Sequence, residues 1–189
     1  MFSNAMQLFH KKFSLLILLA GTIIMIFIML ISGKPLNTSE TPCGILHLEF
    51  ANTEEKVLQV LSAWKKNSSN TNDIIAAAKG NTWFDFLFLL FYALFLYSSC
   101  YRLSRMVTNK IISSLLSFFA IAALLAGGLD MLENIGMLLS LSGQASHAIA
   151  LFTSIVSIIK WVLVLGAITS LIVGILVFIF QRKTKMEVV

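Results

Sequence analysis

The sequence predicts an all-α protein: a four-transmembrane-helix bundle with a small, mostly helical extracytoplasmic cap between its first and second helices. Two observations predict this fold class. The first is composition, because 58% of the 189 residues are apolar, 12% are charged and the mean hydropathy is +0.88, unlike an ordinary soluble domain. The second is the presence of four apolar runs, each near or above the roughly 20 residues that a helix needs to cross about 30 Å of hydrocarbon.

We interpret the chain as a single integral membrane domain, residues 1–189. The predicted spans are residues 13–32, 83–101, 111–139 and 149–180, and residues 33–82 form the cap. The first run is longer than a secretory signal core and no small-x-small cleavage site follows it. We therefore expect an uncleaved anchor.

Basic residues flank the spans at three places: before the first, between the second and third, and after the fourth. They are Lys11, Lys12, Arg102, Arg105, Lys110, Arg182, Lys183 and Lys185. An even number of spans puts all three groups on one side of the membrane, and the positive-inside rule assigns that side to the cytoplasm. We expect both termini there and the cap outside. The basic residues form no stripe with interleaved aromatics, so no nucleic-acid partner is predicted.

The cap carries local signals for secondary structure. In GILHLEF, residues 44–50, apolar and polar residues alternate, which predicts a short strand or an interfacial segment. The following stretch, NTEEKVLQVLSAWKK, predicts an amphipathic helix capped by Asn52 or Thr53. Asn72 is expected to cap a further helix that continues into the second span. Cys43 in the cap and Cys100 near the other membrane face are too far apart for an intramolecular disulfide.

Ionisable residues occur at one depth in three of the spans. Counting about 20 residues outward from the cytoplasmic ends of the third and fourth spans reaches Asp130 and Lys160, and the second span begins near Asp85. Glu133 and Asn134 follow Asp130 at helical spacings of three and four. Because a charge at the centre of a lipid-facing helix costs about 2.5–3.5 kcal/mol, these side chains should face one another in an interior pocket open to the outside.

Three interpretations of this cluster remain open. In the structural one, Lys160 pairs with Asp130 or Glu133 to fix helix register, while Gly127 and Gly128 let the third helix pack closely. In the second, the pocket binds a ligand. In the third, it is a metal-dependent or acid/base enzyme site for an outer-leaflet or periplasmic substrate, to which further side chains, His47, Glu49 and His147, would contribute.

Neither a conducting pathway nor a named enzyme class is favoured. The cytoplasmic halves of the third and fourth spans have few polar residues, so a continuous polar lining is not predicted. Neither Gly-x-Ser-x-Gly nor His-Glu-x-x-His occurs. The sequence therefore leaves the activity, any cofactor and any metal unassigned.

The segments GILHLEFANTEEKVLQVLSAW, FDFLFLLFYALFL and LDMLENIGML together resemble a family of small, uncharacterised bacterial four-span membrane proteins. In that family a Gly-Ile-x-x-x-Glu segment and a short helix ending in Trp precede a span that begins near Asp, and a later helix carries Asp-x-x-Glu-Asn. The matching positions are Glu49, Trp64, Asp85, Asp130, Glu133 and Asn134. The resemblance covers most of the chain. It implies four spans and a bacterial inner membrane, and it implies no activity.

The leading prediction is an integral membrane protein that binds a lipid headgroup, a small ligand or a protein partner at an outward-facing polar pocket. Membrane lipid is the expected partner, and the cap is the candidate surface for a protein partner. The candidate ligand-binding residues are Asp85, Asp130, Glu133, Asn134, Lys160 and Glu49.

Overall fold

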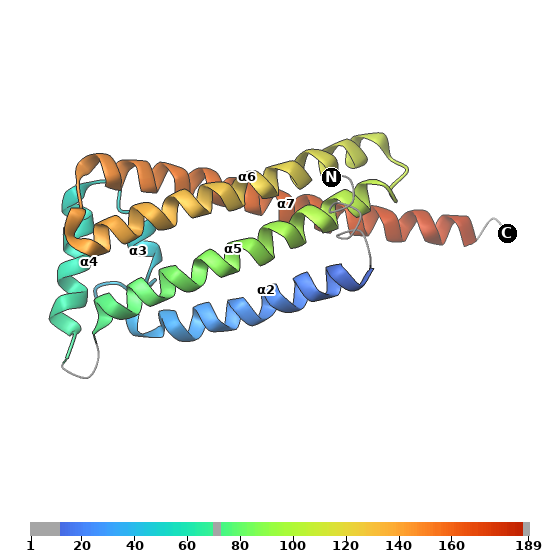
Figure 1. Ribbon diagram of the computed structural model, residues 1–189. Helices are drawn as coiled ribbons and strands as arrows, with labels where there is room; N and C mark the ends of the chain where they lie inside the picture. Colours follow the sequence, from blue (N-terminus) through green and yellow to red (C-terminus); the bar gives the residue numbers. More distant parts are fainter. Residues whose placement is uncertain (1–11, 70–72, 187–189) are drawn as a thin grey trace, which may run out of the picture.

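Four long helices dominate the computed structural model, which describes residues 12–69 and 73–186 (Figure 1). They are α2 (Lys12–Gly33), α5 (Ile74–Ser104), α6 (Lys110–Leu139) and α7 (His147–Met186). Each is long and apolar enough to cross a membrane, and no strand occurs among the described residues. The predicted fold class, an all-α bundle of four membrane helices, is confirmed, and each predicted span lies inside one helix.

Two of the helices extend well beyond the predicted spans. α5 begins at Ile74, so residues 74–82 of the predicted cap belong to the helix, which continues into the second span as expected. Its N-cap is Asp73, whose side chain accepts a hydrogen bond from the amide of Ala76 at 3.1 Å. Asn72, which we expected as the cap, lies outside the described residues. α7 likewise continues past residue 180 to Met186.

The cap, defined from here on as residues 34–69, contains the short helices η1 (Lys34–Leu36) and α3 (Leu46–Glu49) and the longer α4 (Glu54–Asn67). Of the two alternatives for residues 44–50, the short strand is wrong, because residues 46–49 form α3 and turns flank it, while the interfacial segment stays a prediction. No strand of the described chain is available to pair with this segment, so its amides bond locally, as Glu49 N does to Ile45 O at 3.1 Å. Thr53 is the N-cap of α4 and accepts a hydrogen bond from Lys56 N.

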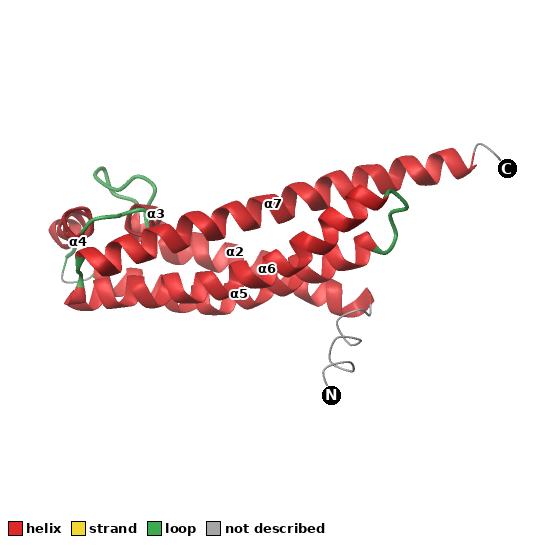
Figure 2. Ribbon diagram, turned by 90° about the horizontal axis from the view of Figure 1, so that it is seen from above, coloured by secondary structure: helices red, strands yellow, loops and turns green. Residues whose placement is uncertain are grey.

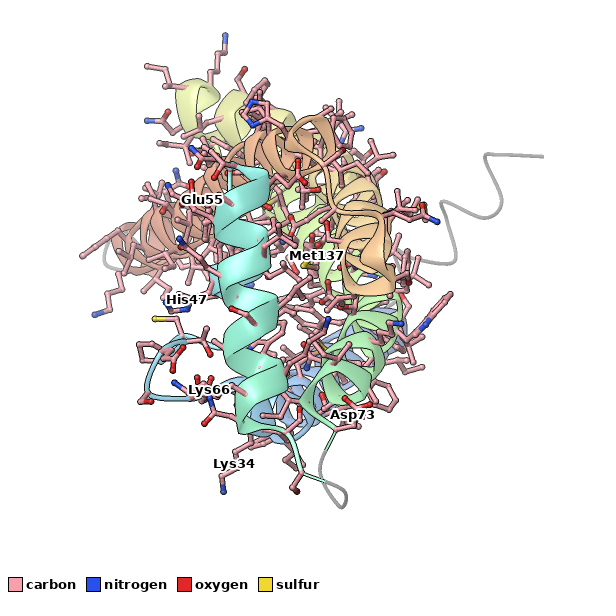
Figure 3. All side chains as sticks on the ribbon, turned by 90° about the vertical axis from the view of Figure 1, so that its left-hand side faces the viewer. Lys34, His47, Glu55, Lys66, Asp73 and Met137 are labelled. Carbon is pink, nitrogen blue, oxygen red and sulfur yellow. The ribbon has the colours of Figure 1, made fainter. Side chains whose placement is uncertain are left out.

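Trp64 joins segments of the cap to one another and packs in an apolar cluster at the end of the bundle. Its side chain is fully buried, and its indole N–H donates to Leu36 O at 3.1 Å and to Thr41 Oγ1 at 3.0 Å. The surrounding apolar cluster includes Met137 and Leu141 from the end of the bundle. Figure 3 shows α4 lying across this end, in front of Met137. We call it the cap end. The loop between α5 and α6 lies at the opposite end, with the last turns of α7 (Figure 1).

The four helices form an open arc. α2 packs along α5, α5 packs against α6, and α6 packs against α7, whereas α2 makes almost no contact with α6 or α7 (Figures 1 and 2). At Gly127 of α6 an added Cβ would lie 2.8 Å from Ala93 Cβ, so this glycine does permit close packing against α5. At Gly128 an added Cβ would meet nothing within 4 Å, so the expectation of a packing role is wrong for this residue.

Candidate functional site

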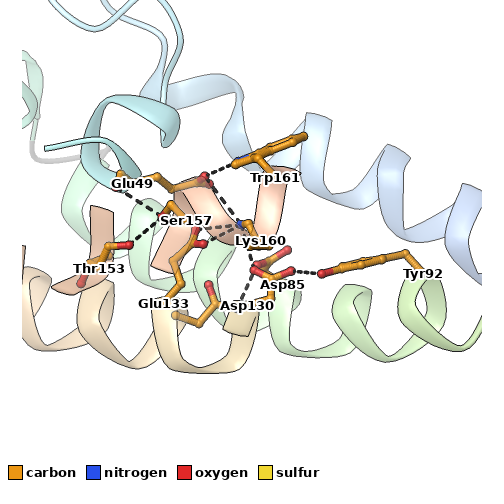
Figure 4. Close-up of polar contacts among 10 residues, drawn as sticks. Glu49, Asp85, Tyr92, Asp130, Glu133, Thr153, Ser157, Lys160 and Trp161 are labelled. Carbon is orange, nitrogen blue, oxygen red and sulfur yellow. Dashed lines mark hydrogen bonds and ion pairs between the residues drawn. The ribbon is translucent and has the colours of Figure 1, made fainter. Parts of the chain in front are cut away.

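A buried lysine lies at the centre of the polar cluster, near the cap end. Lys160 Nζ is 2.8 Å from both carboxylate oxygens of Glu133, 3.0 Å from Asp130 Oδ1 and 3.7 Å from Glu49 Oε2 (Figure 4). Lys160 is only 6% exposed, Asp130 3% and Glu133 0%. One ammonium group thus joins α6, α7 and α3.

Three neutral side chains donate hydrogen bonds to carboxylates of the cluster. Tyr92 OH donates to Asp130 Oδ2 at 2.7 Å. Asn134 Nδ2 donates to Asp85 Oδ2 at 2.8 Å, which ties α6 to α5. Trp161 Nε1 donates to Glu49 Oε2 at 3.3 Å. The six predicted site residues therefore form two neighbouring groups, Lys160 with Asp130, Glu133 and Glu49, and the pair Asp85–Asn134.

Local helix geometry explains most of this arrangement. Asp130, Glu133 and Asn134 share one face of α6, and all three are buried there. On α7, Ser157 lies one turn before Lys160, and its hydroxyl contacts two backbone carbonyls, Thr153 O at 2.9 Å and Glu49 O at 3.4 Å. The second contact helps to hold α3 against α7.

Our list of candidate site residues did not include Tyr92, Ser157 or Trp161. The seven-residue spacing from Asp85 to Tyr92 places both on one face of α5, and that spacing was the available signal. Trp161 is next to Lys160 in sequence, but its bond to Glu49 joins residues 112 positions apart. Local spacing carries no information about such a partner.

A cavity of about 650 Å³ extends from the cluster into the gap between α2 and α7. Four of the predicted site residues line its cap end: Glu49, Asp85, Asp130 and Lys160. Glu133 and Asn134 are fully buried beneath them. The rest of the wall is mostly apolar and includes Ile26, Met29, Leu30, Phe88, Phe95, Leu96, Val164 and Ile168, with the polar side chains of Thr22, Asn81 and Tyr92 among them. The cavity therefore has one polar end and a mostly apolar body.

Neither His47 nor His147 joins the cluster. His47 lines a separate cavity of about 850 Å³ between α3 and α4, beside Cys43, and His147 is exposed at the start of α7. Among residues 12–69 and 73–186, no three His, Cys, Asp or Glu side chains are grouped so that they could hold a metal ion. The ammonium of Lys160 lies between the carboxylates, where a cation would otherwise bind. The metal-dependent alternative thus lacks a ligand set in the described chain.

The fold and the site together define a class: four-span helical membrane proteins with a buried lysine–carboxylate cluster beside a cavity that opens between two helices. No protein-family model matches the chain, and comparisons with curated proteins and with solved structures find no similar protein. The resemblance to a bacterial four-span family therefore stays a prediction.

Proposed function

We propose that the protein binds one membrane amphiphile in the cavity between α2 and α7. The polar group of the amphiphile lies against the cluster, and its hydrocarbon part lies along the apolar wall. The observation that carries this proposal is that a single cavity joins Lys160 and its carboxylates to a wall of apolar side chains. Its volume of about 650 Å³ falls within the range of about 300–1,000 Å³ that is common for small-molecule sites.

A purely structural role accounts for the ion pairs and leaves the cavity unexplained. Protein interiors are packed with few voids larger than a water molecule. Here an apolar space remains open because α2 does not close onto α7. In a bilayer such a space is accessible from the side, and the molecules available to fill it are lipids. An amphiphile fills the apolar part and also brings a polar group to the charged end.

The binding proposal is tested by filling the cavity with protein. Ile26 and Ile24 are both on α2, but only Ile26 lines the cavity, whereas Ile24 is 58% exposed on another face. Native mass spectrometry of the detergent-purified chain should show a bound lipid in the native protein and in Ile24→Trp. We expect the bound lipid to be lost in Ile26→Trp. Equal retention by the two variants would refute binding in this cavity.

The proposal also includes a location: a bacterial inner membrane, with the cap outside and both termini in the cytoplasm. Its support is the charge at the end of the bundle opposite the cap, where Arg102, Arg105, Lys110 and Arg182 lie on or next to the helix ends. In this orientation the polar end of the cavity is at the level of the outer leaflet.

Native cysteines make the orientation testable. Cys43 in the cap is exposed and Cys100 is fully buried. A membrane-impermeant maleimide should label Cys43 in intact spheroplasts. In a Cys43→Ser background, Thr108→Cys in the exposed loop between α5 and α6 should react only after permeabilisation. The opposite pattern would put the cap in the cytoplasm.

A further inference from the structure

We infer that the polar group received by the cluster is a primary ammonium, so that the ligand is an amine-bearing amphiphile. This inference rests on the proposed function and adds the chemical class of the ligand. It follows from the donors and acceptors that the described residues present to the cavity, and from the balance of charge there.

The hydrogen-bond donors of the cluster are already engaged. Lys160 Nζ contacts Glu133, Asp130 and Glu49, Tyr92 OH donates to Asp130, and the indole of Trp161 donates to Glu49. A phosphate or carboxylate that entered the cavity would have to take a donor from one of these buried acceptors. An anionic polar group is therefore a poor match for this end of the cavity.

Acceptors, in contrast, remain available. Asp85 accepts one hydrogen bond, from Asn134 to Oδ2, and no cation among the described residues pairs with it. Its carboxylate lines the cavity and keeps capacity for further donors.

Asn81 supplies a second, independent acceptor. This residue is 1% exposed and lines the same cavity, and its Nδ2 donates to Met29 O at 3.1 Å and to Ser32 Oγ at 2.7 Å. Because a backbone carbonyl can only accept, the bond to Met29 fixes which end of the amide is nitrogen. Asn81 Oδ1 is then a buried acceptor without a partner among the described residues. A buried acceptor without a donor is destabilising, so a ligand N–H or O–H group would stabilise this side chain once its amide oxygen turns toward the cavity.

The formal charge selects the ammonium among such donors. Three carboxylates line the cap end of the cavity, those of Glu49, Asp85 and Asp130, and Lys160 is the cation that lines it with them. Lys160 also holds Glu133 from beneath, so the negative charge is in excess. A primary ammonium offsets this charge and offers three N–H donors, whereas a quaternary ammonium carries no N–H. Suitable sources are the headgroup of an aminophospholipid and a long-chain amine.

The first test compares matched probes on the native full-length chain in detergent. Dodecylamine and dodecanol share a tail and differ in the polar group, and ethanolamine has the amine without the tail. We expect dodecylamine to bind about tenfold more tightly than dodecanol, the factor that one charge-assisted hydrogen bond supplies, and ethanolamine to bind weakly. Binding is measured from the shift of Tm with probe concentration.

Lipids of defined headgroup identify the source of the amine. Native mass spectrometry from nanodiscs should show retention of phosphatidylethanolamine in preference to phosphatidylcholine and phosphatidylglycerol. A preference for dodecylamine without one for phosphatidylethanolamine assigns the site to single-chain amines and still supports the ammonium. Equal retention of all three lipids together with equal affinity for amine and alcohol overturns it, while the amphiphile proposal stands.

A variant of Asp85 tests whether this carboxylate is responsible for the preference for the amine. Asp85→Asn removes the charge, keeps the size of the side chain and can still accept from Asn134, so the tenfold preference should fall to near one. The control is Glu55→Gln, an exposed carboxylate on α4. An unchanged preference in Asp85→Asn overturns the inference. If dodecylamine and dodecanol bind Ile26→Trp as well as the native chain, or ethanolamine binds as tightly as dodecylamine, the proposed amphiphile function itself fails. The native-chain comparison needs no variant, so the inference stays falsifiable even if Asp85→Asn does not fold.

Discussion

Replacement of Lys160 by methionine should destabilise the protein more than replacement of any single carboxylate around it. The reason is the unequal number of partners. Lys160 is the only cation that the described chain places beside Glu133, Asp130 and Glu49, whereas each of these carboxylates is one of three around the ammonium. Lys160→Met leaves three carboxylates close together without a cation. Glu133→Gln leaves the ammonium with two carboxylates and an amide oxygen.

The distances give the scale of the effect. At an effective dielectric constant of about 20, attractions over 2.8, 3.0 and 3.7 Å are about 6, 5.5 and 4.5 kcal/mol. Lys160→Met removes all three attractions, and it also removes the unfavourable desolvation of the ammonium, which offsets part of the loss. We therefore expect the free energy of unfolding to fall by about 3–5 kcal/mol, as for other broken buried pairs. Glu133→Gln loses one attraction and keeps a hydrogen bond, so we expect about 1–3 kcal/mol.

Thermal unfolding in detergent, followed by tryptophan fluorescence, separates these outcomes. With about 2–4 °C of Tm per kcal/mol at this chain length, Lys160→Met should lower Tm by roughly 6–20 °C. The matched control is Lys65→Met, which removes an exposed lysine from α4 and should leave Tm unchanged. Adding Glu133→Gln and Asp130→Asn to Lys160→Met should restore part of the loss. The reasoning is refuted if Glu133→Gln alone costs as much as Lys160→Met.

Four further substitutions test the helix packing, the cap and one exposed ion pair. Gly127→Ala should lower stability by about 1–3 kcal/mol through overpacking, because the new Cβ would lie 2.8 Å from an α5 side chain. Gly128→Ala should leave stability unchanged, because its Cβ would meet nothing within 4 Å. Equal Tm values for the two variants would contradict the close approach at Gly127. Trp64→Phe removes two buried hydrogen bonds and should cost about 1–3 kcal/mol, with faster proteolysis of the cap, and an unchanged cleavage rate would argue against its role in joining the cap segments. Lys66→Met should leave Tm unchanged, because its 2.9 Å pair with Glu40 is exposed; a clear loss would show that this pair holds the cap in place.

The sequence contains enough information to predict the cluster because lipid excludes charge. Asp85, Asp130 and Lys160 lie on three helices. Counting residues from the far ends of the third and fourth spans gives the depth of Asp130 and Lys160, and the start of the second span gives the same depth for Asp85. Since a charge that faces hydrocarbon is costly, the three side chains had to turn inward. The structure places all three on the wall of one cavity, where Lys160 pairs with Asp130 and Asp85 pairs with Asn134. Helical spacing then adds Glu133 and Asn134, which share the face of Asp130.

Other features are absent from local sequence patterns. α2 is apolar on every side, so its sequence indicates no preferred neighbour, and the gap between α2 and α7 could not be anticipated. Alternation over residues 44–50 is compatible with a short strand, but a strand needs a neighbouring strand to pair with, and the described chain has none. Residues 46–49 form the short helix α3 instead. The unpaired acceptor of Asn81 depends on contacts with Met29 and Ser32, about 50 residues away.

The position of Lys160 on the last helix has a consequence for biogenesis. Synthesis proceeds from the N-terminus, so Asp130 and Glu133 on α6 emerge before the cation that neutralises them. Until α7 is inserted, the carboxylates of α6 have no cation beside them, and a helix that carries such charges inserts less favourably into the bilayer. We therefore expect a chain that terminates before residue 147 to be held by the insertion machinery or degraded.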